Sequence, residues 1–494
     1  TAHYNCALGH AALSENTTGT QNVAVGYQSL GNSTTANYNT AIGYQSLNDL
    51  TNGASNTAVG NNSASAITTG YDNTAMGVSA LAGTVDGFYN TALGRSAMQA
   101  NTSGAANVAI GWKALDANTT ANHNVAIGRD ALGVNTVGHS NVAVGNYALD
   151  ANTDADYNVA IGYEALGANT TGNQNTAVGA YCLDANTTGT DNTSIGYQSL
   201  SANTTGYNNV ACGDRALRDN VTGHNNTALG RYALKTNTSN ANTAVGSQAL
   251  EACTSGDNNT AMGYQAIHLA TTATWNTAIG REALLNCTGG GLNTAIGGYS
   301  MDSLTTGTDN TAIGFKSGET ITTGDFNVCI GRYAGSGQVA TGDKELWMAN
   351  DNVGSGNAKC WIHGNSSGAC YQGNNSSSWS TGSDRRLKKN IVDSTKGLAE
   401  INQIRVTNFE YKLEEEIDMS EFPLAESPHQ VVLGGGKEGQ VQTGVIAQEI
   451  ESILPECVVT SGKGAKTVTN DPIIWALVNA VKELSAEVSA LKSS

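Results

Sequence analysis

A repeat of seventeen residues fills most of this chain and limits what it can fold into. Each unit begins Asn-x-Ala-(Ile/Val/Leu)-Gly-x-x-(Ala/Ser)-Leu and continues into a polar segment that often reads Asn-Thr-Thr-Gly. Twenty units follow one another, and every step is seventeen residues except one of sixteen. Such a period predicts a solenoid, in which each unit packs only on its neighbours. The units open at Asn5, Asn22, Asn39, Asn56, Asn73, Asn90, Asn107, Asn124, Asn141, Asn158, Asn175, Asn192, Asn209, Asn226, Asn242, Asn259, Asn276, Asn293, Asn310 and Asn327.

One unit is expected to form one coil of a mostly β solenoid. A helical hairpin repeat needs about thirty residues or more, and glycine with β-branched residues disfavours helix. We predict a short strand, a glycine turn, a second short strand and a polar loop in each coil. Coils stacked at about 4.8 Å would form a rod of roughly 95 Å. The recurring Gly, such as Gly111, predicts positive φ or close backbone approach, and the recurring Asn predicts a ladder of stacked amides.

The strand pattern predicts self-association. In the unit Asn107–Gly111, Asn107 and Ala109 point to one side of the strand, and Val108 and Ile110 point to the other. Neither side carries charge, and a thin coil can bury only one of them within itself. We expect an identical parallel chain to cover the second apolar side. Three chains close such a ring well, although the repeats alone leave two chains open.

Composition excludes several classes of function. Charged residues make up 13% of the chain, against about 25% in ordinary domains, and the net charge of −17 argues against a nucleic-acid partner. No stretch predicts a membrane span or a secretory signal. The nine cysteines contain no CxxC pair, so we expect free buried thiols made in a reducing compartment. Cys360 and Cys370 remain the one conceivable pair, and no cofactor or metal site is expected.

The repeats predict no enzyme site. Acidic residues such as Asp130, Glu164 and Asp214 occur singly, without a recurring histidine or aromatic cleft. Contact with a ligand is expected from the Thr-rich loops, such as 118–120, rather than from the opening asparagines. Trp112 and Tyr27 directly follow the recurring Gly, and we expect these aromatic side chains to pack along the edge rather than to contact sugar.

The repeat ends near residue 335, and we predict a β neck over 336–382. Residues 345–349 and 358–363 are expected to be two strands joined by the Gly-rich turn 352–356. Such a neck would cover the unpaired edge at the end of the solenoid, residues 1–335.

The segment 383–494 has a different composition, with more charge and no repeats. We predict a helix over 398–404, a strand over 405–411 and a short helix over 444–455 that proline ends. A heptad helix over 472–492 is expected to register three chains. Its apolar seam is Ile474, Leu477, Val481, Leu484, Val488 and Leu491.

A serine beside a basic run, Ser383-Asp-Arg-Arg-Leu-Lys-Lys-Asn390, follows the loose polar stretch 373–382. A serine hydroxyl becomes a nucleophile when a base takes its proton, and lysine can be that base when nearby cations lower its pKa. From these residues alone, the alternative is a serine that caps a helix and a basic face in solvent.

This run, with Gly444–Ile450, Leu454–Glu456 and the heptad helix after it, resembles the endosialidase-type intramolecular chaperone. That family is a self-cleaving serine peptidase domain at the C-termini of phage tail spikes and fibres, and the likeness spans 383–494. It implies trimerisation, assistance in folding, and cleavage between Gly382 and Ser383. The implied nucleophile is Ser383 and the implied base is Lys388, with Lys389 as the alternative base. Support for the oxyanion or the motif is implied for Asp384, Arg385, Arg386 and Lys389.

The repeats resemble those of bacteriophage tail fibres and, more remotely, the heads of trimeric autotransporter adhesins. We therefore expect a viral tail fibre or spike, made in the host cytoplasm and located in the virion tail. Its expected partners are two further copies of itself, a host cell-surface glycan or protein receptor, and other tail proteins that bind a region preceding Thr1. The alternatives are a bacterial trimeric surface adhesin and a polysaccharide-degrading tail spike.

Overall fold

The computed structural model of the 494-residue chain describes residues 2–337, 341–349, 360–366, 370–372, 391–422, 441–460 and 465–493. The chain divides into two compact units. The first comprises Thr1–Ser366 with Tyr371–Asn375, and the second comprises Ser367–Cys370 with Ser376–Ser494. Within the described ranges, no helix combines the length and the apolar character that a membrane span requires.

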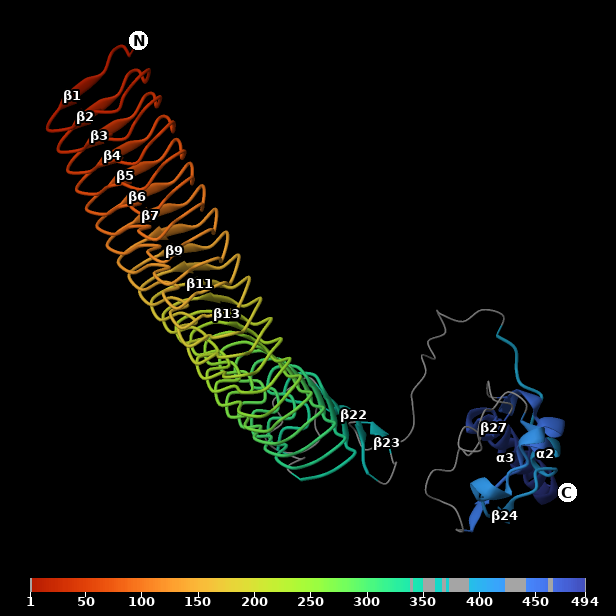
Figure 1. The fold of residues 1–494 in the computed structure, drawn as a ribbon. Helices are drawn as coiled ribbons and strands as arrows, with labels where there is room; N and C mark the ends of the chain where they lie inside the picture. Colours follow the sequence, from red (N-terminus) through yellow and green to blue (C-terminus); the bar gives the residue numbers. More distant parts are fainter. Residues whose placement is uncertain are drawn as a thin grey trace. The chain divides into compact units, whose positions relative to one another are not determined.

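The first unit confirms the predicted solenoid of stacked coils (Figure 1). Each coil contributes one three-residue strand, and each strand pairs in parallel and in register with the strand of the next coil. The strands are β1 Cys6–Leu8, β2 Val23–Val25, β3 Thr40–Ile42, β4 Thr57–Val59, β5 Thr74–Met76, β6 Thr91–Leu93, β7 Val108–Ile110, β8 Val125–Ile127, β9 Val142–Val144, β10 Val159–Ile161, β11 Thr176–Val178, β12 Thr193–Ile195, β13 Val210–Cys212, β14 Thr227–Leu229, β15 Thr243–Val245, β16 Thr260–Met262, β17 Thr277–Ile279, β18 Thr294–Ile296, β19 Thr311–Ile313 and β20 Val328–Ile330.

The prediction of a second strand in each coil was wrong. The chain instead turns through left-handed residues, as at Lys113, with φ of 57°, and Leu115, with φ of 53°. The Lys113 N–H donates to the carbonyl of Arg95 in the preceding coil at 3.1 Å, and the Leu115 N–H donates to that of Ala131 in the following coil at 2.9 Å. The left-handed turns therefore direct backbone donors along the stack, so coils are joined there without regular strand geometry.

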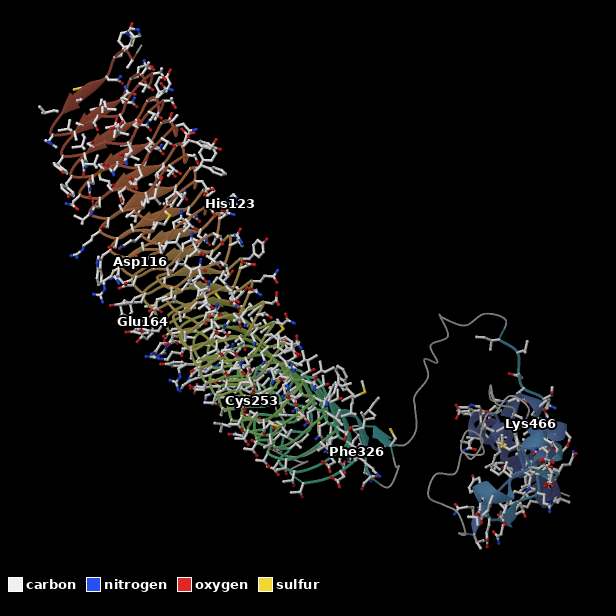
Figure 2. All side chains as sticks on the ribbon, viewed as in Figure 1. Asp116, His123, Glu164, Cys253, Phe326 and Lys466 are labelled. Carbon is white, nitrogen blue, oxygen red and sulfur yellow. The ribbon has the colours of Figure 1, made fainter. Side chains whose placement is uncertain are left out.

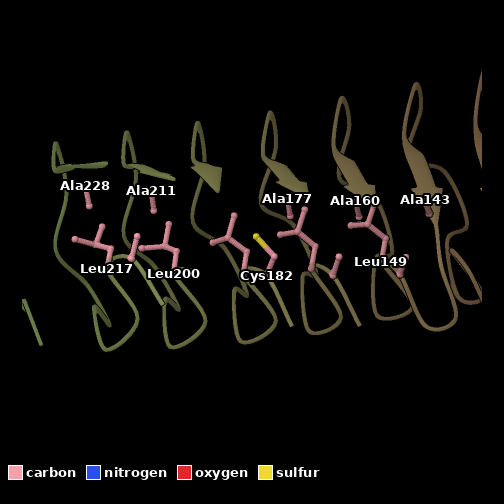
Figure 3. Packing of buried hydrophobic residues seen from close by; sticks show 14 of the residues in the cluster. Ala143, Leu149, Ala160, Ala177, Cys182, Leu200, Ala211, Leu217 and Ala228 are labelled. Carbon is pink, nitrogen blue, oxygen red and sulfur yellow. The ribbon is translucent and has the colours of Figure 1, made fainter. Parts of the chain in front are cut away.

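The interior of each coil is narrow and filled by small side chains. Asn107 and Ala109 are fully buried, whereas Val108 is half-buried and Ile110 is 37% exposed, as the alternation predicted. A leucine from the turn, such as Leu149, lies across from the strand alanines (Figure 3). In most coils two alanines and one leucine fill this space, as Ala143, Ala148 and Leu149 do, so the coil needs no larger apolar residue inside it.

The opening asparagines form the predicted ladder of amides. Asn175 Oδ1 accepts from the backbone N–H of Asn192 at 3.1 Å. Its Nδ2 donates to the carbonyl of Gly189 at 2.8 Å and to Asn158 Oδ1 at 3.2 Å. Each amide thus satisfies one backbone donor and one backbone acceptor that the thin coil buries away from water.

A second amide ladder was not foreseen. The asparagine of the Asn-Thr-Thr-Gly segment was interpreted as part of an exposed loop, but it is fully buried. Asn186 Nδ2 donates to Asn169 Oδ1 at 2.8 Å and to the Gly189 carbonyl at 3.0 Å. The signal in the sequence was the recurrence of Asn at this repeat position. This ladder comprises Asn101, Asn118, Asn135, Asn152, Asn169, Asn186, Asn203 and Asn220.

The cysteines of the solenoid lie at several different repeat positions, so some are buried and others are exposed. Cys182, Cys253 and Cys287 are buried free thiols, and burial raises their pKa to about 11, so they remain protonated at neutral pH. The expectation of buried thiols was wrong for Cys6 and Cys212, which are exposed because they lie on the outward side of their strands. Outside the repeats, Cys457 is buried and Cys370 is an exposed free thiol.

The parallel sheet continues past the last repeat. Strand β21 (Leu346–Ala349) pairs in parallel with β20, and β22 (Cys360–Gly364) pairs antiparallel with β21. These are the two strands predicted for the neck, and β23 (Cys370–Gln372) belongs to the same sheet. The buried Trp347 stacks on His363 with ring centroids 4.0 Å apart. The edge of the last parallel strand is therefore paired, while the predicted turn 352–356 lies outside the described residues.

The second unit is small and mixed. The predicted helix 398–404, strand 405–411 and helix 444–455 are present but shorter, and the last helix is slightly longer than predicted. Gly444, which was assigned to the short helix, ends a strand instead, and the remaining strands and short 3-10 helices were not predicted. The helices and strands of this unit are α1 Leu398–Ile401, β24 Thr407–Phe409, η2 Glu414–Glu416, η3 Met419–Glu421, β25 Gln442–Gly444, α2 Ala447–Ile453, η5 Pro455–Cys457, β26 Val458–Thr460, β27 Lys466–Val468 and α3 Asn470–Ser493.

We predict that Asn175→Ala destabilises the solenoid by roughly 2 kcal/mol or more. The substitution leaves the buried Asn192 N–H without its acceptor, and it removes one of the two amide donors to the Gly189 carbonyl, which keeps Asn186 Nδ2. An unsatisfied buried group costs about 1–3 kcal/mol. Chemical denaturation followed by circular dichroism measures the effect. The exposed Asn52→Ala is the control, and equal stability of the two variants would contradict a structural role for the ladder.

We predict that Gly196→Ala is far more damaging than Gly167→Ala. Gly196 has a φ of +132°, and a Cβ there would lie 2.5 Å from the carbonyl oxygen of Gly213 in the next coil. The nearest atom to a Cβ at Gly167 lies at 3.4 Å. Backbone strain of this kind costs about 1–3 kcal/mol before the clash is added. Paired thermal melts test the difference, and a Gly196→Ala melt that matches Gly167→Ala would refute it.

Candidate functional site

The residues predicted to cleave the chain lie outside those that the structure describes. They are Gly382, Ser383, Asp384, Arg385, Arg386, Lys388 and Lys389. The described chain resumes at Ile391, directly after the basic run, and leads into α1. The structure therefore shows the chain that follows the motif, and it does not show the groups that are proposed to react.

The other two motifs of the resemblance build the core of the second unit. The segment Gly444–Ile450 forms the end of β25 and the first half of α2, and Leu454–Glu456 begins η5. Ile450, Leu454 and Cys457 are buried against Ala476 of α3. These motifs thus position α2 and η5 on the C-terminal helix.

Charged pairs lie on the surface of this core. Arg405 makes a bidentate ion pair with Glu449 on α2, and this partner lowers the pKa of the Glu449 carboxyl. Lys466 on β27 pairs with Glu451. Exposed pairs of this kind contribute little to stability, so we assign them a role in orienting the segments that they join.

Helix α3 makes hydrogen bonds to the backbone of residues 396–398, which follow the basic run. The Nδ2 of Asn479 donates to the carbonyl of Lys396 at 2.9 Å, and the carboxylate of Glu483 accepts from the N–H of Leu398 at 2.8 Å. A Cβ at Gly397 would collide with the carboxylate of Glu483, so this close approach requires glycine. We call Asn479 and Glu483 the α3 clamp.

The other side of α3 is apolar and exposed. The predicted heptad seam lies on this helix, and its six side chains are between 42% and 75% exposed. In contrast, Ala476 and Ala480 of the same helix are buried. A row of exposed aliphatic side chains on a helix of 24 residues is typical of helices that form coiled coils.

The solenoid carries a matching exposed surface, which we call the strand stripe. It consists of the third residue of the strands, an aliphatic side chain that points away from the coil interior. Continuous exposed apolar surface of this kind marks an interface. The members that are most exposed are Leu8, Ile42, Met76, Ile110, Ile161, Ile195, Leu229, Met262, Ile279, Ile296, Ile313 and Ile330.

The aromatic residues beside this stripe mostly contact one another or cations. Tyr27 stacks between His10 and Tyr44, with centroids 5.2 Å apart on each side. Arg129 lies over the ring of Trp112 with its guanidinium carbon 5.6 Å from the centroid. The ring faces are therefore occupied, which favours the predicted packing along the edge over contact with sugar.

A recess in the solenoid brings together carboxylates that occur singly in the sequence. It has a volume of about 410 Å³ and is lined by Tyr147, Asp150, Glu164, Gly167, Ala168 and Asp184. Asp150, Gly167 and Asp184 occupy the same repeat position in three successive coils. Because Gly167 has no side chain, the space between the two aspartates stays open. Burial, with Glu164 nearby, raises the pKa of both aspartates. Glu164 lies on the same edge of the solenoid as Asp116 (Figure 2).

Comparison with known families supports the C-terminal resemblance. The family model described as chaperone of endosialidase, a peptidase family, matches residues 383–459. The match begins at the predicted nucleophile and includes α1, α2 and η5, and it ends before α3. No solved structure matches the chain. A self-cleaving intramolecular chaperone domain is therefore supported for the second unit. The solenoid lies outside the matched residues.

We predict that Asp184→Asn raises the melting temperature at pH 7. Burial is the largest cause of the raised pKa of Asp184, and its Oδ1 has no hydrogen-bond partner among the described residues. A carboxyl whose folded pKa is raised penalises the fold once it ionises, so stability falls as pH rises through that pKa. The gain should shrink as the pH approaches the ordinary aspartate pKa of about 3.9. Melts from pH 3.5 to 7.5, with the exposed Asp86→Asn as control, check this, and a pH-independent gain would contradict it.

Proposed function

We propose that this chain is a viral tail-fibre or tail-spike protein that assembles as a homotrimer. The solenoid is the shaft that contacts the host cell, and the second unit is a folding device that is released by cleavage between Gly382 and Ser383. The observation that carries the proposal is the match of a chaperone family directly downstream of a solenoid with an exposed apolar strand stripe.

Two exposed apolar surfaces, one in each unit, support self-association. The strand stripe repeats along the shaft and the heptad seam runs along α3. An isolated seam with β-branched residues at a and leucine at d favours two strands. The proposal of a trimer rests on two arguments. The family that the second unit resembles forms trimers, and three copies of the strand stripe can close into a ring.

The near-identity of the coils explains the need for a folding device. If one shaft slips by a whole coil against another, every stripe residue except those at the ends still meets an equivalent partner. Register is therefore weakly specified by the shaft itself, and long parallel pairings form slowly. A trimeric nucleus at one end of the chain sets the register, and its later removal leaves an assembly that is stable for kinetic reasons.

The proposed cleavage is a reaction of the chain with itself. Lys388 takes the proton of the Ser383 hydroxyl, and Oγ attacks the carbonyl carbon of Gly382. The peptide bond breaks as the proton passes to the nitrogen of Ser383, which leaves an ester between Gly382 and Oγ. Water then hydrolyses that ester to a Gly382 carboxylate and a free hydroxyl. Backbone or cationic donors from the basic run stabilise the oxyanion.

The proposed partners follow from this placement. The exposed Thr-rich loops of the shaft would contact a host cell-surface glycan or protein receptor. The buried free thiols Cys182, Cys253 and Cys287 suit synthesis in a reducing compartment such as the host cytoplasm. The mature location would be the tail of the virion.

We predict that Ser383→Ala abolishes cleavage and leaves a full-length trimer. Lys388→Ala should also abolish it, whereas Lys389→Ala should cut more slowly, and Ser380→Ala, three residues upstream, should cut as the parent chain does. Intact-mass spectrometry locates the break, and native mass spectrometry counts the chains in the product.

The outcomes separate the parts of the proposal. Cleavage of Ser383→Ala between Gly382 and Ser383 would remove the assignment of the nucleophile. Cleavage that survives Lys388→Ala and is lost in Lys389→Ala would exchange the bases. A released shaft that contains one chain would refute self-association.

A further inference from the structure

The solenoid has a second exposed row besides the strand stripe, which we call the aromatic edge. Its members directly precede the opening asparagine of a coil, and they are Tyr4, Tyr38, Tyr89, Tyr157, Trp275 and Phe326. Their side chains are between 53% and 86% exposed. Their backbones are fixed by the stack, as where the N–H of Trp275 donates to the carbonyl of Asp257 in the preceding coil at 3.1 Å. A large ring on a fixed backbone loses little conformational freedom when it binds a partner.

The charge on this edge differs from the charge on the opposite edge. The polar segments that precede the opening asparagines from Asn22 to Asn327, each of five or six residues, contain eight aspartates and no lysine or arginine. The lysines and arginines of the repeats all lie within five residues after the recurring Gly. Figure 2 shows the two edges, with His123 at the repeat position of the aromatic edge and Asp116 and Glu164 on the other side. An anionic ligand is therefore disfavoured on the aromatic edge.

The ring faces of the aromatic edge are mostly open. Tyr4 and Tyr89 each contact a neighbouring ring. The other four members are 53–64% exposed, and within the described ranges they stack on no ring and on no cation. On the opposite edge, in contrast, Tyr27 lies between two rings and Arg129 lies over Trp112. The apolar face of a sugar ring can therefore cover the rings of the aromatic edge.

A fixed carboxylate lies beside two of the open rings. Asp156 directly precedes Tyr157, and its Oδ1 accepts from the N–H of His139 in the preceding coil at 2.6 Å. Asp325 beside Phe326 is held in the same way, also at 2.6 Å. The second oxygen of each carboxylate has no hydrogen-bond partner in the part of the chain that the structure describes. It can accept from a hydroxyl group of a sugar that lies on the ring.

The rings are too far apart to form a continuous contact with a second rigid shaft. Neighbouring members are two to seven coils apart, or about 10–34 Å at the interstrand spacing. Polar residues such as Ser55 and Gln174 hold the same repeat position in coils between them. The strand stripe differs, because nearly every coil contributes an aliphatic side chain to it. A flexible polymer suits the spaced rings, since it can place one unit on each ring and bind through several weak contacts.

We propose that the aromatic edge binds an uncharged polysaccharide on the surface of the host cell. The rings stack on the apolar faces of its sugars, and Asp156 and Asp325 accept hydrogen bonds from its hydroxyl groups. The aspartates of the edge select against polysaccharides that carry carboxylate, sulfate or phosphate groups. This inference rests on the proposed function, because it assigns the receptor of the shaft to a chemical class and to one edge.

The first step of the test measures the preference of the parent protein. The full chain is produced, allowed to complete its cleavage, and applied to an array of purified bacterial capsular polysaccharides and lipopolysaccharide O-chains, half uncharged and half anionic. The bound glycans should be uncharged. Biolayer interferometry with the best-bound polysaccharide then compares the apparent affinities of the parent protein and its variants.

The variants remove or keep the rings. The combination of Tyr157→Ser, Trp275→Ser and Phe326→Ser should weaken the apparent affinity at least about tenfold. Trp275→Tyr keeps an aromatic ring and should bind nearly as the parent protein does. The matched control is Tyr44→Ser, which removes a stacked ring of the opposite edge and should keep the parental affinity. Native mass spectrometry should count the same number of chains in the triple variant as in the parent protein.

Three results overturn the inference. They are parental affinity of the triple variant, a parent protein that assembles and cuts but binds no uncharged polysaccharide of the array, and a lower chain count in the triple variant. The last result would make the aromatic edge a contact between copies of the chain. A parent protein that neither assembles nor cuts refutes the proposed function instead, so the two failures are distinguishable.

Discussion

Hydrogen bonds that run along the axis of the stack make this fold possible. A coil of seventeen residues encloses too little space for a large apolar core, so its backbone groups must be satisfied from neighbouring coils. Asn175 does this by accepting from Asn192 and donating to Gly189. The left-handed turns serve the same purpose, because the N–H of Leu115 reaches the carbonyl of Ala131. Gly196 must be glycine because the next coil approaches its backbone within contact distance.

The proposed self-association follows from the apolar side chains that this arrangement leaves exposed. Asn107 and Ala109 fill the interior, and Ile110 remains on the surface with its equivalents in the other coils. The coil is complete without that row, so the row is available to another copy of the chain. Because the coils are nearly alike, the shaft offers many registers of similar energy. A separate unit that aligns the chain ends is the physical remedy, and the family match at 383–459 is consistent with it.

The last helix of the second unit, α3, has three distinct faces. The seam of α3 is exposed, its alanines pack on η5 and α2, and its clamp holds the chain from Ser394 to Leu398. A helix with these three faces transmits its own position to whatever it holds. We propose that association, folding and self-cleavage are steps of one process rather than independent properties of the chain.

The sequence by itself determined the coil, its period, the inward Asn and Ala and the outward Ile, because repetition and strand alternation are local properties. It also located the seam of α3 and the basic run at Ser383. It could not determine the path of the turn, since the left-handed residues at Lys113 and Leu115 owe their conformation to donors in other coils. For the same reason Asn186 was placed in a loop and is buried. Only tertiary structure decided that Asp150, Glu164 and Asp184 share a recess, or that Glu483 reaches Leu398. Those contacts join residues distant in sequence, and local chemistry does not encode which distant backbone a side chain will meet.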